Sequence, residues 1–141
     1  MSTALIVYVL TGLAALVIVL TRVRLGGAEE AAGRFSISRA VVMVHFFAGL
    51  IAEALWVTFL VAPEDSTPGG SLVGVVALGF WWIVSVCGLL ILTRWLPSHG
   101  RHAGETVADN WSEGPGLSVL AHVGMAIGVV LFTLAYLNHN V

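Results

Sequence analysis

Four long apolar runs limit the folds that this sequence can adopt. They cover residues 3–21, 40–62, 72–93 and 117–137. Each run is close to the roughly 20 residues that an α-helix needs to cross about 30 Å of hydrocarbon. With 58% hydrophobic residues, 10% charged residues and a mean hydropathy of +0.97, the chain differs strongly from soluble domains. The sequence therefore predicts an all-α integral membrane protein, with residues 1–141 forming one four-helix bundle of up-down-up-down topology.

The distribution of arginine predicts how these helices are oriented in the membrane. All six arginines lie in or beside the first and third connections: Arg22, Arg24, Arg34, Arg39, Arg94 and Arg101. The second connection, residues 63–71, carries only Glu64 and Asp65 as charged side chains. Because basic loops stay in the cytoplasm, we expect both termini outside, and the runs 40–62 and 117–137 then point in the same direction. The net charge of −2 argues against a nucleic-acid partner.

Two histidines interrupt the apolar runs at similar positions. His45 lies near the start of the run 40–62, and His122 lies near the start of the run 117–137. At 1.5 Å per residue, each lies roughly 9–10 Å along its helix, so the two are at nearly the same depth. The second and fourth helices of a simple bundle are diagonal neighbours, so we expect the two imidazoles to face each other across the core.

A single b-type haem with two axial histidines fits this gap. Haem iron takes nitrogen ligands from opposite faces, and the apolar macrocycle suits helices rich in Ile, Val, Phe and Leu. Small residues near the ligands, Gly49 beside His45 and Gly124 beside His122, are expected to leave room for the ring. The sequence thus predicts one haem in the cytoplasmic half of the bilayer.

The arrangement of His45 and His122 resembles membrane b-type cytochromes, in which the second and fourth helices of a four-helix core supply the haem ligands. That family carries a second histidine further along each of these helices and holds two stacked haems. In this chain the corresponding positions are Thr58 or Phe59 in one helix and Ala135 or Tyr136 in the other, and none of them is a histidine. The resemblance therefore implies one haem.

Two other interpretations of the histidines stay open. A histidine within a span can form a hydrogen bond to a neighbouring helix, which contributes on average about 0.6 kcal/mol. Alternatively, Met43 and Met125 lie close to the histidines in sequence, and sets of Met and His suit Cu(I). Met43 and His45 nevertheless point about 200° apart on one helix, at 100° per residue, which weakens the copper interpretation.

Glu53 lies near the middle of the run 40–62. A charged side chain at that depth costs at least about 2.5–3.5 kcal/mol, so the carboxyl is expected to be protonated or hydrogen-bonded inward, near Tyr8, Ser85 or Thr133. One interpretation is a carboxyl that exchanges protons or contacts a quinone together with Tyr8. The other is a neutral hydrogen bond between helices.

The predicted function is electron transfer by a one-haem membrane subunit, within or beside a quinol-linked respiratory complex. The alternative is a non-catalytic accessory subunit of a larger membrane complex, or a homo-oligomer, which the close-packing motif of Gly124 and Gly128 would suit. Its expected docking surface is the connection 94–116, around Trp95 and Trp111.

No self-contained catalytic set is evident in the sequence. His99, His102 and His139 are expected in solvated turns or at a terminus, away from the core. The chain lacks lysine and is rich in Ala, Gly, Val and Arg, which would fit a GC-rich bacterial genome. The predicted location is therefore the plasma (inner) membrane of a bacterium, with the chain crossing it several times.

Overall fold

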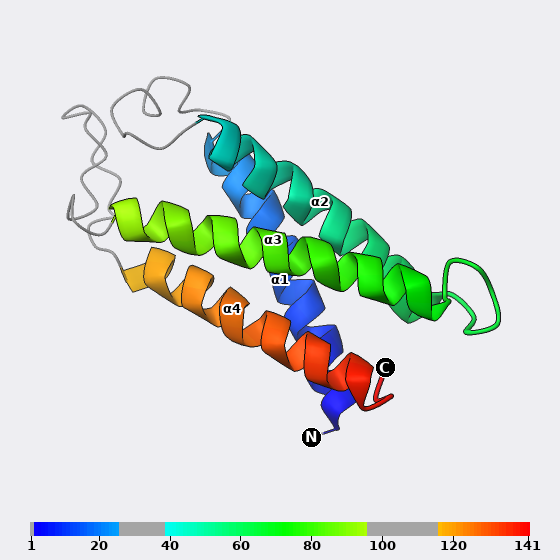
Figure 1. Ribbon diagram of the computed structural model, residues 1–141. Helices are drawn as coiled ribbons and strands as arrows, with labels where there is room; N and C mark the ends of the chain where they lie inside the picture. The colour runs from blue at the N-terminus through cyan, green and yellow to red at the C-terminus, as the bar shows by residue number, and fades with distance from the viewer. Residues whose placement is uncertain (1, 26–38, 96–115) are drawn as a thin grey trace.

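The computed structural model describes residues 2–25, 39–95 and 116–141. These residues form four α-helices: α1 Thr3–Leu25, α2 Arg39–Val61, α3 Ser71–Trp95 and α4 Gly116–Leu137 (Figure 1). The prediction of an all-α chain is confirmed, and the helix bounds lie within a few residues of the apolar runs. The connections 26–38 and 96–115 lie outside the described residues, and with them lie His99, His102 and most of the expected docking surface.

Three of the helices are long and apolar enough to cross a membrane. They are α2, α3 and α4, over Ala40–Val61, Ser71–Thr93 and Val119–Leu137. In α1 the apolar stretch within the searched residues is Thr3–Val19, which is shorter. Each helix satisfies its own backbone hydrogen bonds, as hydrocarbon surroundings require.

Successive helices run in opposite directions (Figure 1). Both termini and the loop between α2 and α3 lie at one end of the helices, and α2 and α4 begin at the other end. The most extensive packing is between α2 and α3, followed by α3 and α4, whereas α1 touches α2 and α4. In the described part of the chain, α2 and α4 make no close backbone contact, so they are diagonal neighbours that run in the same direction.

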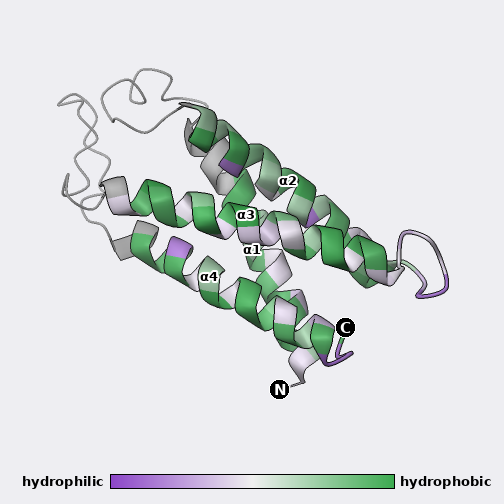
Figure 2. Ribbon diagram, in the orientation of Figure 1, coloured by the Kyte–Doolittle hydropathy of each residue, from purple (hydrophilic) through white to green (hydrophobic). Residues whose placement is uncertain are grey.

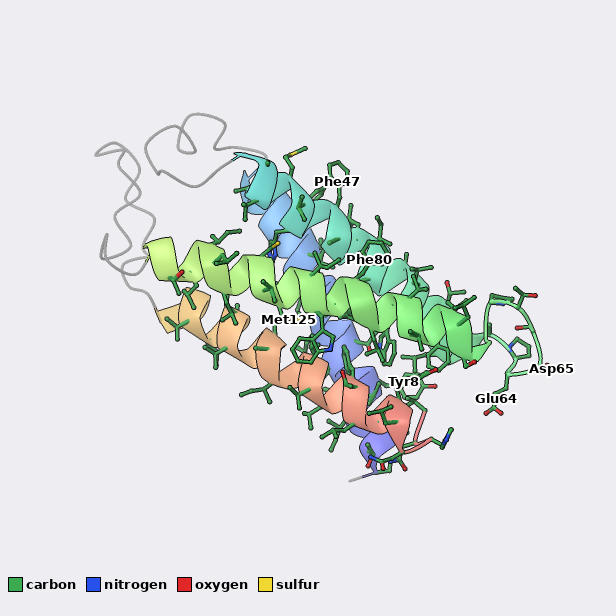
Figure 3. The ribbon with its side chains drawn as sticks, viewed as in Figure 1. Tyr8, Phe47, Glu64, Asp65, Phe80 and Met125 are labelled. Carbon is green, nitrogen blue, oxygen red and sulfur yellow. The ribbon has the colours of Figure 1, made fainter. Side chains whose placement is uncertain are left out.

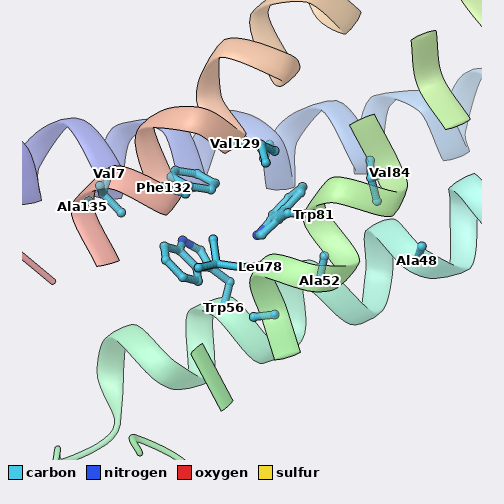
Figure 4. Close-up of a cluster of buried hydrophobic side chains, with 12 residues drawn as sticks. Val7, Ala48, Ala52, Trp56, Leu78, Trp81, Val84, Val129, Phe132 and Ala135 are labelled. Carbon is cyan, nitrogen blue, oxygen red and sulfur yellow. The ribbon is translucent and has the colours of Figure 1, made fainter. Parts of the chain in front are cut away.

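Aromatic rings from three helices form the centre of the core (Figure 4). Trp56 of α2, Trp81 of α3 and Phe132 of α4 are essentially fully buried. The ring centroids of Trp56 and Phe132 are 5.0 Å apart, and those of Trp81 and Phe132 are 5.8 Å apart. Each such pair contributes roughly 0.5–1.5 kcal/mol beyond the burial of its area, so this cluster fixes α2, α3 and α4 against one another.

The outward faces of the helices are apolar. Figure 2 shows hydrophobic colour over most of the visible helix surface, with purple in the loop after α2, near the C-terminus and at a few places on α2 and α4. Phe47 of α2 is 51% exposed and points away from the other helices, whereas Glu64 and Asp65 project from the loop (Figure 3). Such a continuous apolar surface is compatible with contact with the acyl chains of a lipid bilayer.

Candidate functional site

The imidazole rings of His45 and His122 lie together between the helices. Their centroids are 6.1 Å apart, and their planes are inclined by 25°. His45 comes from α2 and His122 from α4, and both side chains are partly buried. Since the backbones of these two helices make no close contact in the described residues, the rings reach toward each other across the diagonal of the helix arrangement.

A backbone carbonyl of α3 fixes the orientation of the His45 ring. Nδ1 of His45 lies 3.0 Å from the carbonyl oxygen of Val84. A carbonyl can only accept a hydrogen bond, so Nδ1 carries the proton and donates it. The nitrogen of His45 that can bind a metal is therefore Nε2. Histidines that bind metals commonly donate their other ring N–H to a carbonyl in this way, which sets the tautomer and the ring orientation.

Gly88 of α3 lies against both rings. A Cβ atom at this position would lie 2.8 Å from Cδ2 of His122 and 3.2 Å from Cε1 of His45. The first distance is shorter than real Cβ contacts allow, so a side chain here would push the rings aside. Glycine at residue 88 thus lets α3 approach both imidazoles, which makes Gly88 a member of the site that the sequence analysis did not identify.

The two glycines that were expected to flank the rings occupy different surroundings. Gly49 is buried against α3, where a Cβ would lie 3.9 Å from Cγ2 of Val84, an ordinary contact. Gly124 is exposed, and a Cβ there would meet no atom within 4 Å among the described residues. A residue two positions after His122 points about 200° away from it on the helix, and the room that Gly124 was expected to leave for the haem stays a prediction. A Cβ at Gly128 would likewise meet no atom within 4 Å among the described residues.

A glycine of α3 lies against one ring of α2 and one ring of α4 at a second level along the helices. A Cβ at Gly74 of α3 would lie 2.7 Å from Cε2 of Tyr136 and 3.1 Å from Cε2 of Phe59. These three residues lie 14 positions from Gly88, His122 and His45 respectively (88 minus 74, 136 minus 122 and 59 minus 45). The centroids of the Phe59 and Tyr136 rings are 5.7 Å apart. A glycine of α3 therefore contacts one ring from α2 and one from α4 at both levels, but the second level offers no imidazole.

The methionines do not complete a copper site in the described structure. Met43 is 47% exposed on α2, and Met125 packs against the hydrophobic core from α4. In the described ranges, no group of three or more His, Cys, Asp or Glu side chains is arranged to hold a metal ion. The histidine pair is therefore the candidate ligand set of this part of the chain.

Glu53 is not hydrogen-bonded to the residues expected around it. Its Oε2 atom is buried without a hydrogen-bond partner among the described residues. The hydroxyl of Tyr8 donates instead to the carbonyl oxygen of Leu60, at 3.2 Å. The hydroxyl of Thr133 donates to the carbonyl oxygen of Val129. The structure thus leaves the expected pairing of Glu53 with Tyr8 unformed.

His139 lies at the opposite end of the helices from the histidine pair. It is exposed after the end of α4, and its φ angle of 51° places it in the left-handed region.

The fold and the site define a helical protein with three helices able to cross a membrane and a pair of imidazoles between two parallel helices. Comparison of the chain with protein-family models, curated proteins and solved structures finds no match.

Proposed function

We propose that the chain is a membrane electron-transfer subunit that holds one b-type haem, with His45 and His122 as the axial ligands. The observation that carries this proposal is the separation of 6.1 Å between the two ring centroids. Metal–imidazole nitrogen bonds are about 2 Å long, and two such bonds on opposite sides of one metal ion place the ring centroids roughly 6 Å apart. The visible spectrum of the purified protein supplied with haem tests the proposal.

The surrounding residues fit this role. The carbonyl of Val84 holds the His45 ring with Nε2 as the coordinating nitrogen. Gly88 provides a position without a side chain beside both rings. The apolar side chains of the helices give the site surroundings of low dielectric constant. When bound, the haem supplies the one-electron chemistry, and the protein supplies its ligands, its orientation and its surroundings.

The second level supports one haem per chain. Phe59 and Tyr136 occupy the positions where a second pair of ligands would lie, and both rings pack against Gly74. The hydroxyl of Tyr136 already donates to the carbonyl oxygen of Ser71, at 2.9 Å. A phenyl ring cannot coordinate iron, so this level acts as packed core.

The proposed setting is the plasma membrane of a bacterium, with α1 as a fourth span and with both termini outside. In this orientation the histidine pair lies in the cytoplasmic half of the bilayer. A quinol in the membrane is the proposed electron donor, and a larger membrane complex or a second copy of the chain is the proposed partner. The apolar outward faces of α2, α3 and α4 support contact with such membrane components.

The topology makes a prediction for labelling in intact cells. Single cysteines would be introduced as Ser66→Cys and Ala103→Cys in a Cys87→Ala background, because Cys87 is the native thiol. A membrane-impermeant maleimide should label residue 66 in intact cells and residue 103 only after permeabilisation, since the arginines flank the first and third connections. Labelling of both positions from one side would contradict the topology and the depth assigned to the histidines.

A further inference from the structure

Four polar atoms in the core lack hydrogen-bond partners among the described residues. They are Oε2 of Glu53, Nε1 of Trp56, Nε1 of Trp81 and Oγ of Ser85. Trp56 and Trp81 have no exposed surface, and Ser85 is 4% exposed. Nearly all buried polar side-chain atoms in proteins are hydrogen-bonded, because an unpaired one loses its hydration without compensation. Four such atoms on two adjacent helices therefore require an explanation.

The four residues lie at successive levels along α2 and α3. Gly49 lies level with Val84, and His45 lies level with Gly88. Because α2 and α3 are antiparallel, each residue further along α2 corresponds to one residue earlier on α3. In this register Ser85 lies level with residue 48 of α2. Trp81 lies level with residue 52, next to Glu53, and Trp56 follows about one turn further.

These levels lie between the histidines and the end of α2 at Val61. The first level, at residue 48, is three residues from His45, or roughly 4.5 Å at 1.5 Å per residue. Glu53 is eight residues from Val61, where α2 ends, or roughly 12 Å, but 14 residues from Arg39, where α2 begins, or roughly 21 Å. The nearer end is the one that carries both termini (Figure 1).

The chemistry of the four groups calls for a small ligand that both donates and accepts hydrogen bonds. An indole N–H can only donate, a hydroxyl can do both, and a carboxyl offers acceptor oxygens. The Trp56 and Trp81 rings are held by Phe132 (Figure 4), so their N–H groups cannot turn freely to find protein partners. Buried water typically makes about three hydrogen bonds to polar groups that would otherwise be unpaired.

We propose that Glu53, Trp56, Trp81 and Ser85 bind internal water molecules. These water molecules supply the hydrogen bonds that the four buried groups lack. The proposal goes beyond the haem site and does not depend on it, since it stands on side chains of the protein alone.

Solid-state NMR of the full chain in lipid bilayers, with ¹⁵N-labelled tryptophan, tests this site. Magnetisation transferred from water should reach the indole N–H groups of Trp56 and Trp81. Trp82 of the same helix is the internal control, because its Nε1 donates to Oγ1 of Thr133 at 3.3 Å and its side chain lies on the outward face. Transfer to Trp56 and Trp81 as slow as transfer to Trp82 would show a dry core and overturn the proposal.

Two variants and one added ligand sharpen this experiment. Glu53→Leu should reduce the transfer to both indoles by more than half, whereas Glu64→Gln in the exposed loop should leave it unchanged. Unchanged transfer in Glu53→Leu would overturn the role of the carboxyl. A short-chain benzoquinone in the bilayer should not affect the transfer, and loss of transfer together with shifted indole resonances would assign the site to a quinone headgroup instead of water.

Discussion

Replacing either His45 or His122 with alanine should abolish the low-spin haem spectrum and weaken haem binding by more than about 100-fold. The expected loss is large because each variant removes one of two axial ligands, and even the loss of a residue that only supports a metal ligand costs about 10–100-fold. Haem titration, followed by the Soret and α bands, measures both effects. His45→Ala also removes the hydrogen bond to Val84, so it should also lower the stability of the protein without haem.

The control for these variants is His139→Asn. Asparagine is chosen because residue 139 has a φ angle of 51°, a conformation that asparagine tolerates better than alanine. This variant should bind haem with unchanged affinity and an unchanged spectrum, since residue 139 follows the end of α4 at Leu137 and His122 lies near its start. Low-spin spectra that persist in both core histidine variants would place the axial ligands elsewhere in the chain.

Gly88→Ala should lower haem affinity and convert part of the haem to a high-spin form. The added Cβ would lie 2.8 Å from Cδ2 of His122, so the His122 ring must move away from its position opposite His45. Overpacking of this kind typically costs about 1–3 kcal/mol, which corresponds to about 5- to 150-fold in affinity. Gly88→Leu should remove haem binding altogether, because its side chain would occupy the space beside both rings.

The matched control for this second prediction is Gly79→Ala on the same helix. A Cβ at residue 79 would meet no atom within 4 Å in the described structure, while the gain in helix propensity is the same as at residue 88. Haem affinity should be unchanged in this variant. Equal affinities for Gly88→Ala and Gly79→Ala would show that α3 plays no part in the haem site.

Much of the fold could be predicted from the sequence because the length of an apolar run sets the length of a helix. The runs 40–62, 72–93 and 117–137 match α2, α3 and α4 within a few residues. The meeting of His45 and His122 also followed from sequence, since depth along parallel helices depends only on residue counting. The orientation in the membrane stays a prediction.

The contribution of α3 could not be predicted in the same way. Gly88 and Gly74 contact rings from both neighbouring helices, but this depends on the register between helices, which no local pattern of one helix specifies. The clue available in the sequence was their spacing of 14 residues, equal to that between His45 and Phe59. Gly124 was expected at the site because it lies close to His122 in sequence, and a Cβ there would meet no atom within 4 Å among the described residues.

Two of the unpaired polar groups near Glu53 could not be predicted from the sequence. Ser85 was expected near the carboxyl, and the register places it roughly 7.5 Å away along the helix axis, whereas Trp56 and Trp81 gave no sign of a polar role. Only their packing against Phe132 shows that the two indole N–H groups are held inside the protein. A tryptophan in an apolar run therefore reveals nothing about its N–H until its neighbours are known.

The most direct test of the central claim is the reduced-minus-oxidised visible spectrum of the purified wild-type chain after titration with haem. One haem held by His45 and His122 should saturate at one equivalent per chain and give the sharp α band of low-spin bis-imidazole coordination. Folded protein that shows no Soret absorbance after haem is supplied would contradict the claim. The histidine pair would then be an ordinary contact between helices, and the chain would be an accessory subunit of a larger membrane complex.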